Sequence, residues 1–200
     1  MPSAAILAGG GASRFGGRDK GALLIGGRSI RDRQIAELAT LTDDILVVGN
    51  GGAPAGLLPP GSPPIRFIAD RVAGCGPLGG LDAALATARE EPLIVVACDM
   101  PFVTKALLGH LASVVGGEDV AVPFDERGPH PLCAAYAPRC GAAVACRLEE
   151  GRLAVRGLLD DLRVRIVSGR ELASFGDPRR LLANVNTVVE YREWLARSSA

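Results

Sequence analysis

The chain has 200 residues, of which 48% are hydrophobic and 22% are charged, and these proportions are typical of one packed globular domain. Its 22 basic and 22 acidic residues cancel, and no block of lysines and arginines alternates with aromatic residues, which argues against a nucleic-acid partner. The apolar runs are far shorter than the roughly 20 residues of a membrane-spanning helix, and the first residues lack the basic segment of a signal peptide. We therefore expect a single domain over residues 1–200, located in the cytoplasm, with no membrane partner.

Short apolar runs recur along the first part of the chain, and segments with helical spacing lie between them. Runs of consecutive apolar residues are typical of strands that are covered on both faces of a sheet. The predicted strands are 4–7, 45–48, 65–68, 93–97 and 120–122, and the predicted helices are 30–41, 78–88 and 104–115. This alternation indicates βαβ units and predicts a Rossmann-like three-layer α/β/α sandwich with a mostly parallel sheet.

The pattern is less regular after residue 122. It predicts a strand over 131–136, a helix over 140–148, a strand over 163–167 and a final helix over 188–197. Residues 50–64 are crowded with glycine and proline. We interpret them as a surface loop of the same domain, because the strands before and after them need each other as neighbours in the sheet.

The first predicted strand leads into a glycine-rich segment, Leu7-Ala8-Gly9-Gly10-Gly11-Ala12-Ser13-Arg14-Phe15-Gly16-Gly17-Arg18-Asp19-Lys20. Glycines let the backbone turn several N–H groups toward one concavity, and Arg14 and Lys20 add the charge that a triphosphate requires. The segment differs from the P-loop and from the Gly-x-Gly-x-x-Gly of dinucleotide folds. It predicts a triphosphate-binding loop, and the alternative of a simple glycine-rich turn leaves the positive pair unexplained.

Two aspartates stand where predicted parallel strands end, Asp70 after 65–68 and Asp99 after 93–97. Ligands of open α/β sheets bind at the carboxyl ends of the strands, so we expect both carboxylates in the crevice that the glycine-rich loop borders. Magnesium accepts one or two carboxylates together with phosphate oxygens, and Asp99 is the predicted metal ligand. The alternative for each aspartate is a helix N-cap.

Three further motifs leave binding and structural explanations open. The glycine-rich turn 74–80 either presents backbone amides to a base or an acceptor phosphate, or only lets a helix pack closely on the sheet. His130, between two prolines, is either a polar contact to substrate or structural. Asn184 and Asn186 alternate and so face one side of an extended segment, where they either bind a ligand or cap the final helix.

Taken together, these motifs resemble those of the molybdenum cofactor guanylyltransferases, the MobA-like nucleotidyltransferases, in order from residue 4 to about 195. The resemblance rests on Leu7-Ala8-Gly9-Gly10 with Arg14 and Asp19-Lys20, Asp70 followed by Gly76-Pro77-Leu78, Cys98-Asp99-Met100-Pro101, His130-Pro131 and Asn184-Val185-Asn186-Thr187. Phe15 stands where methionine is frequent, and Val188 and Val189 replace the proline and acidic residue often found there.

The resemblance implies an enzyme that uses Mg²⁺ and joins GMP from GTP to molybdopterin bearing molybdenum, releasing pyrophosphate. Its partners would be these two small molecules, with transient contact to molybdoenzymes or their chaperones. The residues that it implies are Leu7, Ala8, Gly9, Gly10 and Asp70 for the nucleotide, Arg14 and Lys20 for the triphosphate charge, Asp99 for the metal and GTP, and Gly76, Asn184 and Asn186 on the pterin side.

The proposed reaction needs positioning and charge neutralisation, with neither a covalent intermediate nor a general base. The enzymatic alternatives are a molybdenum cofactor cytidylyltransferase or another small-molecule nucleotidyltransferase. Gly10 favours the guanylyl branch by resemblance, since cytidylyl relatives more often carry alanine there. A nucleotide sensor or a cofactor-delivery adaptor is the non-enzymatic alternative, which the retention of Lys20, Asp70 and Asp99 disfavours.

Overall fold

The computed structural model describes residues 1–8, 20–49, 64–72 and 74–198. The strands are β1 (Ser3–Leu7), β2 (Leu24–Ile25), β3 (Arg28–Ser29), β4 (Ile45–Val48), β5 (Ile65–Ile68), β6 (Leu93–Ala97), β7 (Val120–Asp125), β8 (Gly128–Pro129), β9 (Cys133–Tyr136) and β10 (Val164–Val167). The helices are α1 (Ile30–Leu38), α2 (Gly76–Thr87), α3 (Lys105–Val114), α4 (Cys140–Glu149), α5 (Val155–Leu158), α6 (Gly169–Ala173), α7 (Pro178–Leu181) and α8 (Val188–Ser198), with the 3-10 turns η2 (Lys20–Ala22) and η3 (Leu159–Asp161).

A central sheet organises the described part of the chain, with the strand order β10-β7-β9-β6-β1-β4-β5 and β8 paired to β7. Strands β6, β1, β4 and β5 are parallel neighbours, as are β7 and β10. The β1–β4 register runs from Ala4↔Ile45 to Leu7↔Val48. Strand β9 runs antiparallel to both β6 and β7. The predicted mostly parallel sheet is confirmed, with β9 and the short β8 as its antiparallel members.

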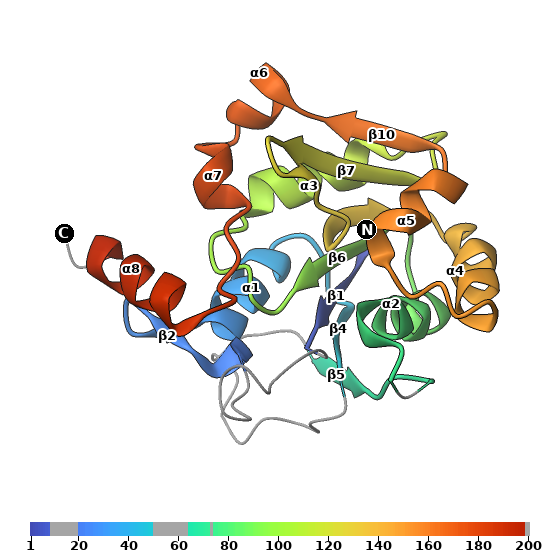
Figure 1. Cartoon of the computed structure of the whole chain (residues 1–200), viewed down its shortest axis with the longest axis horizontal. Helices are drawn as coiled ribbons and strands as arrows, with labels where there is room; N and C mark the ends of the chain where they lie inside the picture. The colour runs from blue at the N-terminus through green and yellow to red at the C-terminus, as the bar shows by residue number, and fades with distance from the viewer. Residues whose placement is uncertain (9–19, 50–63, 73, 199–200) are drawn as a thin grey trace.

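Helices cover both faces of this sheet, as Figure 1 shows. Successive strand residues point to opposite faces, so Ala4 and Ile6 join the core beneath α1 and α3, whereas Ala5 and Leu7 join the core beneath α2. Strands β1, β4 and β6 are buried along their whole length, which accounts for their apolar sequences after Ser3, the one polar residue among them. Burial of each such aliphatic side chain contributes about 1.5–3 kcal/mol. The three-layer α/β/α sandwich is confirmed.

Local sequence sets the helix boundaries. The Ser29 side chain caps α1 by accepting a hydrogen bond from the Asp32 N–H at 3.0 Å, and Thr104 caps α3. Helix α1 ends at Leu38, earlier than predicted. Helix α2 begins at Gly76, two residues before the predicted start, because Pro77 fits the first helical turn. Among the described residues, no helix combines the length and the apolar character needed to cross a membrane.

A hairpin that the sequence analysis missed supports the C-terminal helix. Strands β2 and β3 are joined by Gly26 and Gly27, both at positive φ, in the manner of a two-residue hairpin turn. Helix α8 packs on this hairpin, where the Tyr191 hydroxyl donates to the Leu24 carbonyl at 2.7 Å (Figure 1). The C-terminal helix is thereby tied to the segment that follows Lys20. Strand β8 and the short helices α5, α6 and α7 were also missed.

Candidate active site

Four of the predicted site residues, Lys20, Asp99, Asn184 and Asn186, meet beyond the carboxyl end of β6. The Lys20 Nζ lies 3.4 Å from Asp99 Oδ2 and 3.3 Å from Asn186 Oδ1. The Asn184 side-chain amide donates to Asp99 Oδ1 at 3.2 Å. We call these four residues the Lys20–Asp99 cluster. It joins three segments that are far apart in the sequence.

The charges of the Lys20–Asp99 cluster are largely withdrawn from water, since the Lys20 and Asp99 side chains are 12% and 15% exposed. Charges at such depth are costly without partners, and the ion pair and the two amides supply them. The same groups can serve a ligand. The lysine ammonium suits a phosphate, and the carboxylate and amide oxygens suit a hard cation.

The hydrogen bonds of the Asn-x-Asn-Thr segment show which of its residues cap α8. Thr187 Oγ1 accepts from the Glu190 N–H at 3.2 Å, and Glu190 Oε2 accepts from the N–H groups of Asn186 and Thr187 at 2.6 and 3.0 Å. This reciprocal arrangement is a capping box for α8. Thr187 and Glu190 therefore cap the helix, while the side chains of Asn184 and Asn186 bond Asp99 and Lys20, and ligand binding by these two amides stays a prediction.

Neither predicted aspartate is a helix cap, because Cys75 holds the N-cap position of α2 and Thr104 that of α3. Asp70 Oδ1 lies 3.6 Å from the point where a Cβ at Gly80 would be, and the Leu7 side chain lies 3.5 Å from the same point. Asp70 thus borders the end of β1, from which the glycine-rich segment departs. Strand β5 is three strand spacings, about 14 Å, from β6, and the expected meeting of Asp70 and Asp99 in one crevice stays a prediction.

The predicted triphosphate loop is described only at its two ends. Gly9, Gly10 and Arg14 lie outside the described residues. At one end, the Ala8 N–H donates to the Val48 carbonyl at 2.7 Å and the Leu7 carbonyl accepts from the Cys98 N–H at 3.1 Å. A contact from Ala8 to a nucleotide would therefore have to use its carbonyl group. At the other end, Lys20 opens η2.

The second glycine-rich turn is closely packed. A Cβ at Gly79 would lie 3.0 Å from the Cys75 Cβ and 3.2 Å from the Val72 carbonyl oxygen, which favours the structural explanation for this glycine. Gly76 has a φ of +58° and is the first residue of α2. Its neighbour Pro77 lines the cavity described next.

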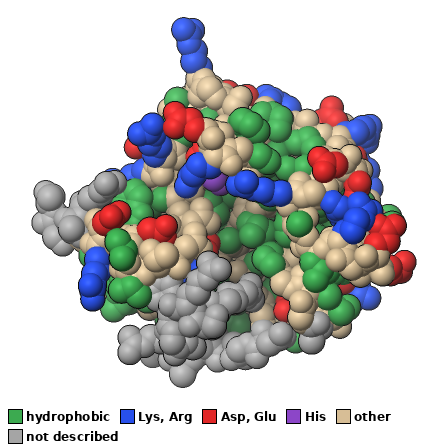
Figure 2. All heavy atoms as spheres, viewed as in Figure 1, with side chains coloured by type: hydrophobic (Ala, Val, Ile, Leu, Met, Phe, Trp, Pro, Cys, Tyr) green, Lys and Arg blue, Asp and Glu red, His purple; other side chains and the backbone are tan. Residues whose placement is uncertain are grey.

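A cavity of about 530 Å³ adjoins the Lys20–Asp99 cluster through Asn184 and Asn186, and we call it the His130 cavity. It is lined by Pro77, Met100, Arg127, Pro129, His130, Pro131, Leu132, Leu153, Ala154, Val155, Arg156, Asn184 and Asn186. Figure 2 shows a hollow in the middle of this face, with Lys or Arg side chains and a histidine gathered along one rim. The cavity is therefore apolar in its lining with a basic edge.

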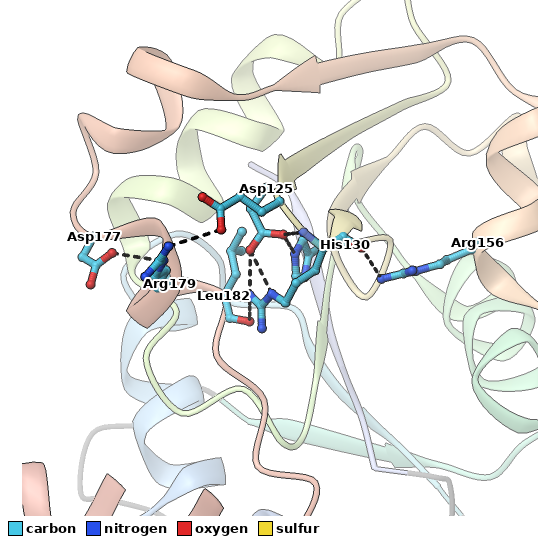
Figure 3. A network of polar contacts seen from close by, with 8 residues as sticks. Asp125, His130, Arg156, Asp177, Arg179 and Leu182 are labelled. Carbon is cyan, nitrogen blue, oxygen red and sulfur yellow. Dashed lines mark hydrogen bonds and ion pairs between the residues drawn. The ribbon is translucent and has the colours of Figure 1, made fainter. Parts of the chain in front are cut away.

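A hydrogen-bond network fixes the basic edge of the His130 cavity (Figure 3). His130 Nε2 lies 2.8 Å from Asp125 Oδ1, and Arg127 Nη2 donates to Asp125 Oδ2 at 2.7 Å and to the Leu182 carbonyl at 3.0 Å. Arg156 Nη2 in turn donates to the Arg127 carbonyl at 3.1 Å. Sequence reasoning missed Asp125, Arg127 and Arg156, although the polar run before His130 was a signal.

The protonation of this network follows from its surroundings. Burial alone would raise the pKa of Asp125, but hydrogen bonds from Arg127 and His130 outweigh it and lower the pKa to about 2. Burial lowers the pKa of His130 below its ordinary value, against the opposing effect of Asp125. At neutral pH the imidazole is therefore neutral, and Nε2 carries the proton because the carboxylate can only accept.

The oxygen atoms around Asp99 are of the kind that binds magnesium. Within the described residues, no three His, Cys, Asp or Glu side chains converge to hold a metal ion. Magnesium needs no such cage, since it is usually bound by one or two carboxylates with substrate phosphates and water. The Asp99 carboxylate and the Asn186 side-chain oxygen, which accepts from Lys20, are hard oxygen ligands of the required kind.

The sheet is mostly parallel, and an ammonium, a carboxylate and two amides meet at the carboxyl ends of its strands. This arrangement is typical of nucleotide-binding α/β proteins. A family model described as the MobA-like NTP transferase domain matches residues 4–166. The molybdenum cofactor guanylyltransferase of Desulfosudis oleivorans is 32% identical over 196 residues, which cover 92% of this chain and 90% of that protein. The chain therefore belongs to the family of MobA-like NTP transferases, and it is a nucleotidyltransferase.

Solved structures show the same fold. The molybdopterin-guanine dinucleotide biosynthesis protein A of Archaeoglobus fulgidus matches with a TM-score of 0.78 and 24% identity, covering 98% of each chain. Rv0371C of Mycobacterium tuberculosis, in complex with manganese, matches with a TM-score of 0.67 and 21% identity, covering 98% of this chain and 100% of that one.

Proposed function

We propose that the protein transfers GMP from GTP to the molybdenum-molybdopterin cofactor, forming the guanine dinucleotide cofactor and pyrophosphate. The observation that carries this proposal is the junction of the Lys20–Asp99 cluster with the His130 cavity through Asn184 and Asn186. A charged centre for a triphosphate next to a cavity for a second molecule is what a two-substrate transferase needs. The name of the Desulfosudis oleivorans relative supports this choice of nucleotide and acceptor.

On the nucleotide side, Lys20 and Arg14 would neutralise the triphosphate, and the backbone of residues 7–10 would contact the nucleotide. Lys20 supports this role because its ammonium already reaches the carboxyl end of β6. Asp70 would contact GTP from the α2 side, near the end of β1.

On the acceptor side, the His130 cavity has a size within the range of small-molecule sites, about 300–1,000 Å³. Arg127 and Arg156 would attract the acceptor's phosphate, and Asn184, Asn186 and the neutral His130 would make polar contacts to it. Gly76 would lie on the same side, since the next residue, Pro77, lines this cavity.

The reaction would be an in-line displacement. An oxygen of the acceptor phosphate forms a bond to the α-phosphorus of GTP, the bond to the β-phosphate oxygen breaks, and pyrophosphate leaves with that electron pair. The acceptor phosphate is already ionised at neutral pH, so no general base is required. Mg²⁺ bound by Asp99 would neutralise phosphate charge, a role supported by the oxygens of Asp99 and Asn186 at the cluster and by a manganese complex of a structural relative. Lys20 and Arg14 would add to that neutralisation, and the amides would orient the two substrates.

Product analysis tests the proposal. The purified protein is incubated with Mg²⁺, molybdopterin cofactor and either GTP or CTP, and both pyrophosphate and the dinucleotide formed are measured. Pyrophosphate and a guanine dinucleotide from GTP alone are expected. Turnover of CTP alone would assign the protein to the cytidylyl branch, and turnover of neither would refute the proposed acceptor.

A further inference from the structure

Gln34 connects helix α1 to the turn that carries Asp99. Its side chain is fully buried, and its Nε2 donates to the carbonyl oxygens of Ala97 at 2.8 Å and Met100 at 2.9 Å. Both partners can only accept hydrogen bonds, so the NH₂ group of the amide must face them. The two carbonyl groups stand on either side of Asp99 in the sequence.

The turn over residues 97–100, which we call the Asp99 turn, is also held by one backbone hydrogen bond within it and one from Val185. The Met100 N–H donates to the Ala97 carbonyl at 3.2 Å, and the Val185 N–H donates to the Asp99 carbonyl at 2.8 Å. Met100 is 1% exposed, so its carbonyl cannot easily exchange the bond from Gln34 for one to water. The backbone of the Asp99 turn is thus held between α1 and the segment that carries the two asparagines.

The choice of glutamine has a cost to stability. Gln34 Oε1 is buried and has no hydrogen-bond partner among the described residues. On α1 it stands between Ile30 and Leu38 at the spacing of one helix face, where both neighbours are fully buried. An apolar residue there would remove this unpaired side-chain oxygen, but the buried Met100 carbonyl would lose its bond from Gln34. We expect a buried polar residue with this cost where its hydrogen bonds fix a backbone geometry that apolar packing would leave free. For Gln34 that geometry is the Asp99 turn.

We propose that Gln34 is a positioning residue that holds the Asp99 turn so that the Asp99 carboxylate meets the metal and the triphosphate. It acts through the backbone of Ala97 and Met100 and contacts no substrate itself. The inference rests on the proposed function, in which Asp99 binds the metal. Helix α1 follows the segment that carries Lys20, so the same link keeps Lys20 and Asp99 in a fixed relation.

The test replaces Gln34 with methionine, which keeps the length of the side chain and removes both donors. Ser3→Ala is the matched control, because Ser3 is also fully buried and its hydroxyl bonds Asp44 and the N–H groups of Arg89 and Glu90 at the opposite end of the sheet. Gln34→Met should lower kcat with GTP by about tenfold to a hundredfold, as expected for a small misplacement of a reacting group. Ser3→Ala should keep the parent kcat.

Two further readouts do not depend on activity. Binding of Mn²⁺ in the presence of GTP, measured by electron paramagnetic resonance below the melting temperature of each protein, should weaken in Gln34→Met and not in Ser3→Ala. Amide hydrogen exchange at Met100 and Val185, whose N–H groups bond within and to the Asp99 turn, should accelerate by tenfold or more in Gln34→Met alone.

The outcomes separate this inference from the proposed function. If Gln34→Met matches the parent in Mn²⁺ binding and in exchange at the Asp99 turn, Gln34 is not a positioning residue. If the parent and an Asp99→Asn variant bind Mn²⁺ equally well, the proposed metal role of Asp99 is wrong, and the inference about Gln34 is overturned with it.

Discussion

Replacing Asp99 with asparagine removes the charge at the centre of the Lys20–Asp99 cluster and keeps the shape of the side chain. The new amide oxygen can still accept from Asn184, but the Lys20 ammonium, now 3.4 Å from Asp99 Oδ2, loses its carboxylate. Opposite unit charges at that separation interact by roughly 5 kcal/mol at an effective dielectric constant of about 20. Desolvation of the two side chains, 12% and 15% exposed, offsets much of this attraction.

The larger effect of Asp99→Asn should be on the reaction. Loss of one preorganised electrostatic contact to the transition state costs about 2.7–4 kcal/mol, so kcat with GTP should fall by about a hundredfold or more. Pyrophosphate release at saturating GTP and acceptor measures this change. The KM for the acceptor should change little, because Arg127 and Arg156 at the edge of the His130 cavity are untouched.

Asp44→Asn is the control for this experiment. Asp44 forms an ion pair with Arg66 at 2.6 Å, its side chain is 9% exposed, and it lies beside the amino end of β4, far from the cluster. This variant should lose stability and keep its kcat. Parent turnover in Asp99→Asn, or an equal loss of kcat in Asp44→Asn, would refute the reasoning.

Four further predictions address the charges and the packing. Lys20→Met should weaken GTP binding, with a difference from the parent that shrinks as salt rises; calorimetric titrations at several ionic strengths that find equal affinities would contradict this. Arg156→Met should raise the KM for the acceptor about tenfold while the Kd for GTP stays constant. A change in GTP affinity with an unchanged acceptor KM would show that the His130 cavity does not bind the acceptor. Because the pKa of Asp125 is lowered from 3.8 to about 2, its carboxylate should contribute about 2 kcal/mol of stability above pH 3.8, most of it lost by pH 2.5 as the pH falls toward the folded pKa. Urea unfolding of Asp125→Asn and the parent should therefore differ at pH 7 and converge in acid; a constant difference would exclude this titration. Gly79→Ala should destabilise by about 1–3 kcal/mol because its Cβ would lie 3.0 Å from the nearest side-chain carbon, whereas Gly141→Ala in α4, with open space around it, should melt at or above the parent temperature.

The central strands could be predicted because strands buried on both faces have runs of consecutive apolar residues. Apart from Ser3, the residues of β1, β4 and β6 are all apolar, and the structure covers both faces of these strands. The direction of β9 could not be predicted in this way, since an apolar run reads the same whether its neighbours are parallel or antiparallel. The β2–β3 hairpin could have been predicted, because two consecutive glycines, Gly26 and Gly27, are a recognised signal for a two-residue hairpin turn.

Some features of the candidate site could likewise be predicted from the sequence, and others could not. Strand-end logic pointed to Asp99, and alternation pointed to Asn184 and Asn186, since both arguments depend only on local spacing. The contact between Lys20 and Asp99 spans 79 residues, and only the topology of the sheet brings it about. Gln34 had a signal that was overlooked, a polar residue on the buried stripe of a predicted helix.

The Lys20–Asp99 cluster draws on residues 20, 99, 184 and 186, and this has a consequence for biosynthesis. At about 5–20 residues per second, a ribosome needs roughly 10 s or more to reach Asn186. Until then β1, β4 and β6 can pair, but Asp99 lacks the Asn184 amide and the bond from Val185. A partly synthesised chain can therefore form the centre of its sheet before the cluster is complete.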